Sequence, residues 1–237
     1  MRRRALLGAA VLAGCGGTPR PSAAPASAVA SAAQNRANGP SVTPPAGGRL
    51  WRLDAGASQL RIVVFRGGAA ARLGHHHIVQ AARCEGWLWL PEQGLEGAQG
   101  RIDVPLAELQ LDEAAWRQAA GGEFDERPLS AEDRSATLGN LLRVLRADRY
   151  PKASLQLQAL GGAAPWWLAE VGLSVGGGLA SLRLALDARQ HGANHLRTAG
   201  RLPLRHADLG LQPFSVLGGL LAVREELVLD FDLHWRR

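Results

Sequence analysis

Three consecutive histidines, His75, His76 and His77, are the residues whose type and spacing come nearest to a metal site. Imidazole nitrogens are common ligands of Zn²⁺ and Cu²⁺. In an extended segment neighbouring side chains point to opposite faces, so only His75 and His77 share a face. A third ligand would have to come from a distant histidine, of which there are four: His191, His195, His206 and His234. No cysteine or carboxylate stands at a recognisable ligand spacing. We therefore predict no metal, and a polar turn at His75 and His77.

Motifs of enzymes are missing from the sequence. It contains no Gly-x-Ser-x-Gly elbow, no phosphate-binding glycine loop and no His-Glu-x-x-His pair. The acidic residues alternate with apolar ones as on a surface, and the glycines cluster as in turns. We predict a protein that is not an enzyme and has no cofactor. The positive charge is almost all arginine, Lys152 being the only lysine, and it is scattered among acids, which argues against nucleic acid as a partner.

The N-terminus carries a targeting signal. Arg2, Arg3 and Arg4 precede an apolar run over residues 5–13, which is too short to span a bilayer permanently. The following Leu12-Ala13-Gly14-Cys15 resembles the lipobox of bacterial lipoproteins. That resemblance implies cleavage of residues 1–14 as a signal peptide and acylation of Cys15, which would anchor the chain to a membrane at the periplasmic face of the cell envelope. The alternative is a soluble secreted protein in which Cys15 is incidental.

The remaining features of this part of the chain fit a lipoprotein. Gly16 stands where Asp would favour the inner membrane, so the resemblance favours the outer membrane. Loss of the three arginines in residues 1–14 leaves 24 basic and 21 acidic residues, a formal charge of +3. Residues 15–48 are rich in Ala, Pro, Ser and Gly and are predicted to form a disordered tether. With Cys15 acylated, Cys84 would be the sole remaining cysteine, and we expect a buried, unreactive thiol.

From residue 49 to 237 the pattern has period two, which is typical of half-buried strands. Apolar and polar residues alternate around Leu60, around Leu184 and around Leu229. Further strand candidates lie at residues 84–90, 101–106, 153–160, 167–175 and 196–204. About eight strands with mostly short connections predict an all-β antiparallel barrel or sandwich. Closure into a barrel would remove exposed strand edges.

One helix interrupts the strands. Ser130 and Asp133 form a predicted capping box, and leucines follow at helical spacing at positions Leu138, Leu141, Leu142 and Leu145. The helix should end before Tyr150-Pro151 and lie over the barrel. We predict a long loop at residues 111–129. Chain reversals are predicted at the glycine-containing segments 161–162, 176–178 and 192–194.

The order of motifs along residues 50–235 is similar to that of the YceI family of bacterial lipid-binding proteins. The residues that carry the resemblance are Trp51-x-Leu53-Asp54 with Ser58, Gly86 after Gly74-His75, Leu145-x-Ala147-x-x-Tyr150-Pro151-x-Ala153, Leu173-Ser174-Val175-x-Gly177, Arg205-x-x-Asp208-Leu209-Gly210-Leu211 and Val223-x-Glu225. The resemblance implies an extended, lipocalin-like barrel whose apolar interior holds a long isoprenoid chain, such as a polyprenyl or quinone tail.

A cavity that holds such a chain needs apolar walls, because burial of each CH₂ is worth about 0.8 kcal/mol. These walls are formed by the inward residues of the strands. The predicted lining residues are Leu60, Ile62, Val64, Leu182, Leu184, Leu186, Leu227, Leu229 and Phe231. His75 and His77 would lie at the barrel rim. Both faces of the strand with Trp87 and Trp89 are apolar, so the sequence does not show which face points into the barrel. Two alternative functions also stay open, namely a metal- or redox-linked periplasmic protein and a ligand-free structural envelope protein.

Overall fold

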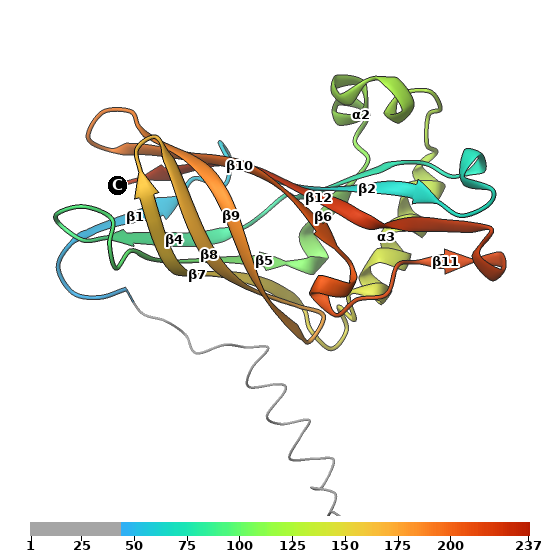
Figure 1. Ribbon diagram of the computed structural model, residues 1–237. Coiled ribbons are helices and arrows are strands. Elements are labelled where there is room, and N and C mark those ends of the chain that lie inside the picture. Colours follow the sequence, from blue (N-terminus) through green and yellow to red (C-terminus); the bar gives the residue numbers. More distant parts are fainter. Residues whose placement is uncertain (1–43) are drawn as a thin grey trace, which may run out of the picture.

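The computed structural model of the chain describes residues 44–237, which form one strongly curved antiparallel sheet (Figure 1). The predicted signal peptide, Cys15 and the predicted tether as far as residue 43 lie outside the described residues. The last residues of the predicted tether contact the sheet. The carbonyl oxygen of Gly47 accepts a hydrogen bond of 2.7 Å from the indole Nε1 of Trp89. The division of the chain at residues 48 and 49 stays a prediction.

Eight strands close into a barrel. In the order in which they pair, they are β1 (Arg49–Leu53), β4 (Glu85–Leu90), β5 (Gln99–Pro105), β7 (Lys152–Ala163), β8 (Trp166–Val175), β9 (Gly178–Gln190), β10 (His195–Arg205) and β12 (Leu221–Arg236). Each pairs antiparallel with its neighbour, and Leu53 of β1 pairs with Trp235 of β12 to complete the ring. The predicted all-β antiparallel barrel is therefore confirmed.

The barrel continues at one end as an open, curved extension. Strand β12 is 16 residues long, so beyond β1 its edge also pairs with β2 (Gln59–Gly67). Strand β2 pairs with β3 (His77–Ala81), and β3 pairs with β6 (Leu109–Leu111). A further short strand, β11 (Ser215–Val216), pairs with β12. Strands β3, β6 and β11 have only two to five residues, too few for a period-two pattern to reveal them.

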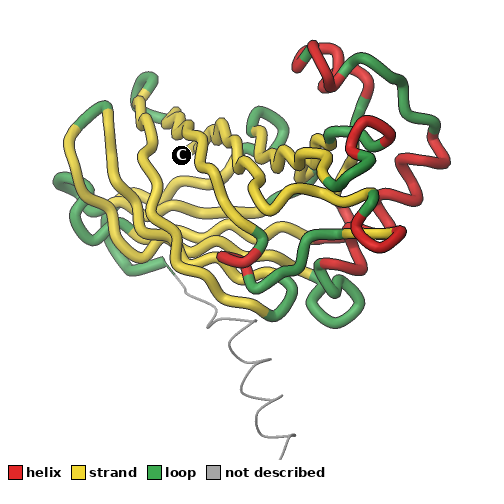
Figure 2. Tube along the Cα trace, turned by 45° about the vertical axis from the view of Figure 1, so that its right-hand side comes forward, coloured by secondary structure: helices red, strands yellow, loops and turns green. Residues whose placement is uncertain are grey.

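Helix α3 (Ala131–Val144) lies beside the open extension (Figure 1). It begins as predicted, because the Ser130 side chain accepts from the backbone N–H of Asp133 and the Asp133 carboxylate accepts from Ser130. Its leucine face is half-buried and covers the space between β6 and β7. Figure 2 shows the α-helices gathered at this end of the strands. None of the helices in residues 44–237 is long and apolar enough to cross a membrane.

Two local predictions are wrong. Residues 111–129 contain helix α2 (Ala114–Ala120) and a short 3₁₀ helix (Gly122–Phe124) where a loop was predicted. Helix α2 is held by tertiary contacts of Arg117, which a local pattern does not reveal. Gly161 and Gly162 do not reverse the chain, since β7 runs on to Ala163 and turns at Ala164-Pro165. Gly162 has φ +108° and lies so close to β8 that a Cβ there would be 2.9 Å from the Trp166 carbonyl oxygen.

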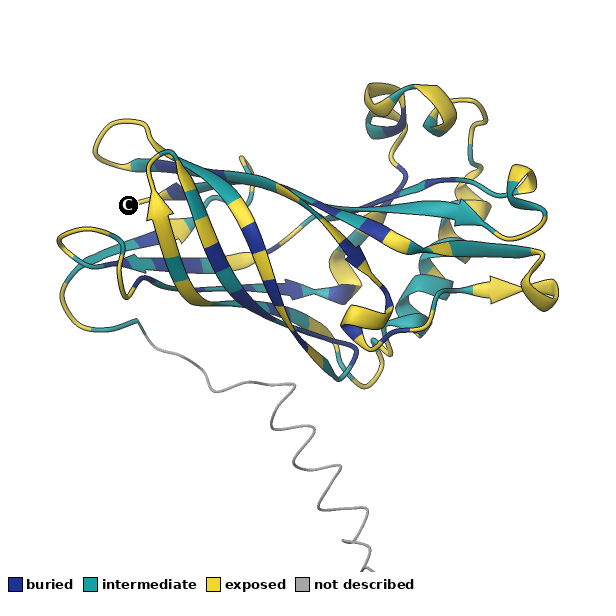
Figure 3. Cartoon of the chain, viewed as in Figure 1, coloured by how far each residue is buried: buried dark blue, intermediate teal, exposed yellow. Residues whose placement is uncertain are grey.

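The core of the described residues lies inside the barrel. Buried apolar side chains run from Trp51 in β1 to Trp235 in β12 and come from seven of the eight barrel strands, whereas β7 contributes partly buried ones such as Leu155 and Leu157. Buried and exposed residues alternate along β9 (Figure 3). Residues 44–237 therefore hold a complete hydrophobic core, as an independently folding domain requires.

Candidate functional site

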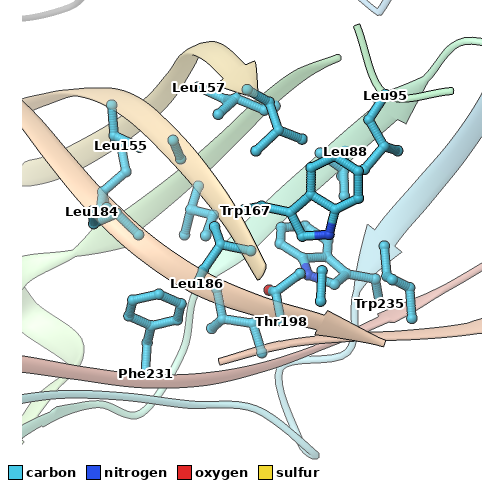
Figure 4. A pocket seen from close by; sticks show the side chains of 18 of the residues that line it. Leu88, Leu95, Leu155, Leu157, Trp167, Leu184, Leu186, Thr198, Phe231 and Trp235 are labelled. Atoms are coloured by element: carbon cyan, nitrogen blue, oxygen red, sulfur yellow. The ribbon is translucent and has the colours of Figure 1, made fainter. Parts of the chain in front are cut away.

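The barrel interior is not filled throughout. Its closed part holds a cavity of about 330 Å³, called here the large cavity, which is partly open to solvent. Figure 4 shows part of its lining, in which leucines surround Trp167, Thr198, Phe231 and Trp235. A cavity of this volume falls at the lower end of the range for small-molecule sites, about 300–1,000 Å³. Its walls are almost entirely apolar, so it suits a flexible hydrocarbon better than a polar ligand.

A second cavity of about 160 Å³, the small cavity, continues the interior into the extension. Its walls come from β2, β3 and the inner face of helix α3, and they include Ile62, Val79 and Leu141. Because α3 lies across the gap between β6 and β7, its half-buried leucines form the wall that the sheet leaves open there. The amphipathic helix is thus part of the candidate site.

Three leucines separate the two cavities. Leu60, Leu155 and Leu229 line both of them, from strands β2, β7 and β12. We call these three residues the waist. Leucine side chains change rotamer on a fast timescale even in packed interiors. One chain-like ligand could therefore extend from the large cavity into the small one after displacement of the waist side chains.

Eight of the nine predicted lining residues lie on the cavity walls. Leu184, Leu186 and Phe231 line the large cavity, and Ile62, Val64 and Leu227 line the small one. Leu60 and Leu229 belong to the waist. Leu182 is buried in the core and is not among the lining residues of either cavity. Whether an inward residue borders free volume cannot be inferred from a period-two pattern.

The structure settles which face of β4 points inward. Leu88 and Leu90 line the large cavity, whereas Trp87 and Trp89 lie on the outer face of the strand. Sequence reasoning missed the lining residues of β7, β8 and β10, which include Leu155, Trp167 and Leu196. The alternation in residues 153–160 predicted a strand there but was not used to choose inward residues.

Four charged or polar side chains line the large cavity: Arg49, Arg101, Gln190 and Thr198. Arg49 donates from Nε and Nη2 to the Pro91 carbonyl oxygen at 3.3 and 3.2 Å. Arg101 binds the Asp103 carboxylate and the Ser154 hydroxyl. Burial alone would raise the pKa of Asp103, but these hydrogen bonds and the Arg101 charge hold it below its usual value.

The three adjacent histidines have structural partners and line neither cavity. His77 Nδ1 lies 2.6 Å from Oδ2 of Asp112, a fully buried carboxylate that also binds Arg117 Nη1 at 3.2 Å. His76 Nε2 lies 2.9 Å from Oε2 of Glu123. Burial and then the neighbouring His77 lower the pKa of His75. These contacts connect β3 and the residues before it to the segment around α2. His75 and His77 are not among the residues that line either cavity, and their position at the barrel rim stays a prediction.

The distant histidines do not complete a site with His75 and His77. His191, His195 and His234 gather with one another on the outside of the barrel, where His195 Nε2 lies 2.8 Å from His234 Nδ1. His206 lines the small cavity and its Nδ1–H donates to the Glu225 carbonyl oxygen. Within residues 44–237 no group of three or more His, Cys, Asp or Glu residues is placed to hold a metal ion.

Comparison with known proteins identifies this fold. The chain superposes on Burkholderia cenocepacia BcnA with a TM-score of 0.55 and 12% identity, covering 77% of this chain and 98% of BcnA. It superposes on a polyisoprenoid binding domain from Saccharophagus degradans, implicated in plant cell wall breakdown, with a TM-score of 0.53 and 14% identity over 78% of this chain and 97% of that one. A mutant Campylobacter jejuni YceI protein has a TM-score of 0.46, 7% identity and coverages of 67% and 84%.

The YceI-like barrel fold predicted from the motifs is thereby confirmed. No protein-family model matches the sequence, and no curated protein matches it. The similarity is thus one of fold, and the cavity walls and the waist are properties of this chain's own residues.

Proposed function

We propose that this protein is a binding protein of the YceI family that carries or sequesters a long isoprenoid lipid, of the polyprenyl or quinone type, in its barrel cavity. One observation carries the proposal: the barrel interior holds two apolar cavities that share three lining leucines, Leu60, Leu155 and Leu229. An elongated hydrocarbon is the ligand that such a space suits. The polyisoprenoid binding domain of Saccharophagus degradans, which has the same fold, supports this ligand class.

The cavity volumes set the length of chain that fits. The two cavities, of about 330 and 160 Å³, together make about 490 Å³. Since a cavity of about 150 Å³ holds one benzene molecule of six carbons, the large cavity fits roughly 13 carbons and both cavities roughly 20. About four isoprene units therefore fill the interior once the waist opens. A longer lipid would leave its remaining units and its headgroup outside the large-cavity end.

We also propose that the protein is anchored at the cell envelope. A chain with Cys15 acylated would be anchored to a membrane on its periplasmic face, with the outer membrane favoured. Two acyl chains give stable anchoring, whereas one gives only marginal binding. Cys15→Ser should release the protein from the membrane fraction and block lipoprotein-type cleavage. Fractionation of cells that express the variant tests this, and retention at wild-type levels would show that the anchor is not Cys15.

Native mass spectrometry of residues 44–237, purified gently from lipid-rich cells, tests the ligand. We expect a retained species with the mass of an isoprenoid lipid. An apo mass under these conditions would contradict the proposal and favour a ligand-free structural protein. A retained Zn²⁺ or Cu²⁺ ion, lost in the His75→Ala/His77→Ala variant, would favour the metal- or redox-linked alternative.

A further inference from the structure

The hairpin between β7 and β8 carries an unusually apolar tip. Between Lys152 and Glu170 the chain has no charged residue. At the tip, Gly161 to Ala164 are exposed, and the side chains of Trp166 and Leu168 are left 73% and 66% exposed. A contiguous exposed apolar surface that contains tryptophan indicates an interaction site rather than ordinary surface. Tryptophan is also the residue enriched where proteins meet the interfacial region of a bilayer.

The same hairpin borders the large cavity. Side chains alternate between the two faces of β8, so Trp167 points inward between Trp166 and Leu168, which point outward. Figure 4 shows Trp167 within the cavity lining, near Leu95 of the neighbouring β4–β5 loop. Ala164, at the turn itself, is also a lining residue. The exposed apolar surface and one end of the cavity are thus two faces of one structural element.

The start of the described chain lies at this end of the barrel (Figure 1). Gly47 binds Trp89 through its carbonyl oxygen, and Arg49, two residues later, lines the large cavity. The sequence has 43 residues before Pro44, including Cys15. A chain anchored through those residues would keep this end of the barrel within reach of its membrane. The apolar surface at the other end, which includes Leu217, has neither the chain start nor the large cavity beside it.

We propose that the β7–β8 tip, residues 161–168, docks on a lipid bilayer, with Trp166 and Leu168 inserted in the interfacial region and the large-cavity end against the lipid. Exposed Glu92 and Glu96 on the neighbouring β4–β5 loop would oppose attraction to anionic lipids. Docking therefore depends on apolar contact, and anionic lipid should not strengthen it. The docking surface goes beyond the proposed function, and only its use for loading a lipid into the cavity rests on that function.

Flotation of delipidated residues 44–237 with phosphatidylcholine vesicles tests the docking. Wild-type protein should float with the vesicles, and Trp166→Ser/Leu168→Ser should lower the partition coefficient about a hundredfold, because two large apolar side chains lose their burial. The matched control is Leu179→Ser/Leu217→Ser, whose leucines are 67% and 70% exposed on the far side from the tip. It should float like the wild type. Addition of phosphatidylglycerol should not strengthen the binding of the wild type or of either variant.

Three outcomes would overturn the docking proposal. The tip variant could float as well as the wild type, the control variant could lose as much binding as the tip variant, or the wild type could be a dimer in solution that the tip substitutions dissociate. The last outcome would mean that a second copy covers the tip. All four substituted side chains are exposed, so unchanged thermal unfolding should confirm that both variants fold.

The two experiments distinguish a failure of the docking proposal from a failure of the proposed carrier function. Vesicle flotation uses protein without cargo, whereas native mass spectrometry measures retained cargo without vesicles. A protein that retains an isoprenoid but does not float contradicts only the docking. A protein that floats but never retains lipid contradicts the carrier function and leaves the docking surface in place.

Discussion

Filling the large cavity with a side chain should stabilise the empty protein and weaken ligand binding at the same time. Ala169 of β8 is the position for this test, because it is 2% exposed, points inward and lines the large cavity. It pairs with Leu160 and Leu184, which line the same cavity. In Ala169→Phe the new ring would enter free volume instead of displacing packed neighbours.

The structure gives the size of both effects. A buried Phe side chain is worth about 1.5–3 kcal/mol, so after the cost of ordering the ring we expect a gain of about 1–2 kcal/mol. In a domain of this size that raises Tm by roughly 2–8 °C. A benzene-sized group takes about 150 Å³, close to half of the cavity volume of about 330 Å³. Six carbons of ligand at about 0.8 kcal/mol each then lose their site, which weakens binding about a thousandfold.

Two measurements on delipidated protein check this expectation. Thermal unfolding gives the stability, and quenching of the lining residues Trp167 and Trp235 by geranylgeraniol reports binding. The matched control is Ala180→Phe, a substitution at a buried alanine of the core that lines neither cavity. There, overpacking should destabilise by about 1–3 kcal/mol. If Ala169→Phe destabilises as Ala180→Phe does and geranylgeraniol binding is unchanged, the hollow interior is refuted.

Further predictions concern the waist, an acid-sensitive ion pair and the buried thiol. Leu229→Ala should cost about 2–5 kcal/mol and lengthen the longest isoprenol retained in native mass spectrometry, whereas Leu182→Ala, at a buried leucine away from both cavities, should destabilise similarly without changing that length. The lowered pKa of Asp103 stabilises the fold at pH values above its unfolded pKa of about 3.9 and is lost as pH falls through the folded pKa. Urea unfolding should therefore show Asp103→Asn to be less stable than wild type at pH 7, with the difference shrinking toward pH 3 and below; a constant difference would contradict the ion-pair account. Burial raises the pKa of Cys84, so iodoacetamide should label it only after unfolding, and rapid labelling of native protein would show an accessible thiolate.

Seven of the eight barrel strands were predictable because they have enough residues for a strand pattern to show, whereas β1, like β3, has only five. Runs around Leu184 and Leu229 fall in strands of 13 and 16 residues, and one face of each is buried. The extension was not predictable in the same way. Strand β3 has both Ile78 and Val79 buried, since α2 and its flanking segment attach to the side that a simple barrel leaves to solvent. Alternation is lost where both faces of a strand are covered.

The sequence predicted which side chains of a strand point inward, but not which of these line a cavity. Period two places Leu182 and Leu184 on the same face, yet only Leu184 borders a cavity. The difference depends on how completely neighbouring side chains fill the space, which is a property of the assembled barrel. The histidines show the same limit. Their spacing predicted a polar turn, but it did not reveal the partner of His77, the buried carboxylate of Asp112, which is 35 residues away in the chain.

The hollow interior is itself an argument for an occupant. Side chains that border free volume lose contacts on one side, so the two cavities make this barrel less stable than a filled one would be. A barrel with a purely structural role would gain from larger side chains at positions such as Ala169, and the strands could carry them. A lipid that enters the cavities restores the missing contacts, so binding and stability are linked in this protein.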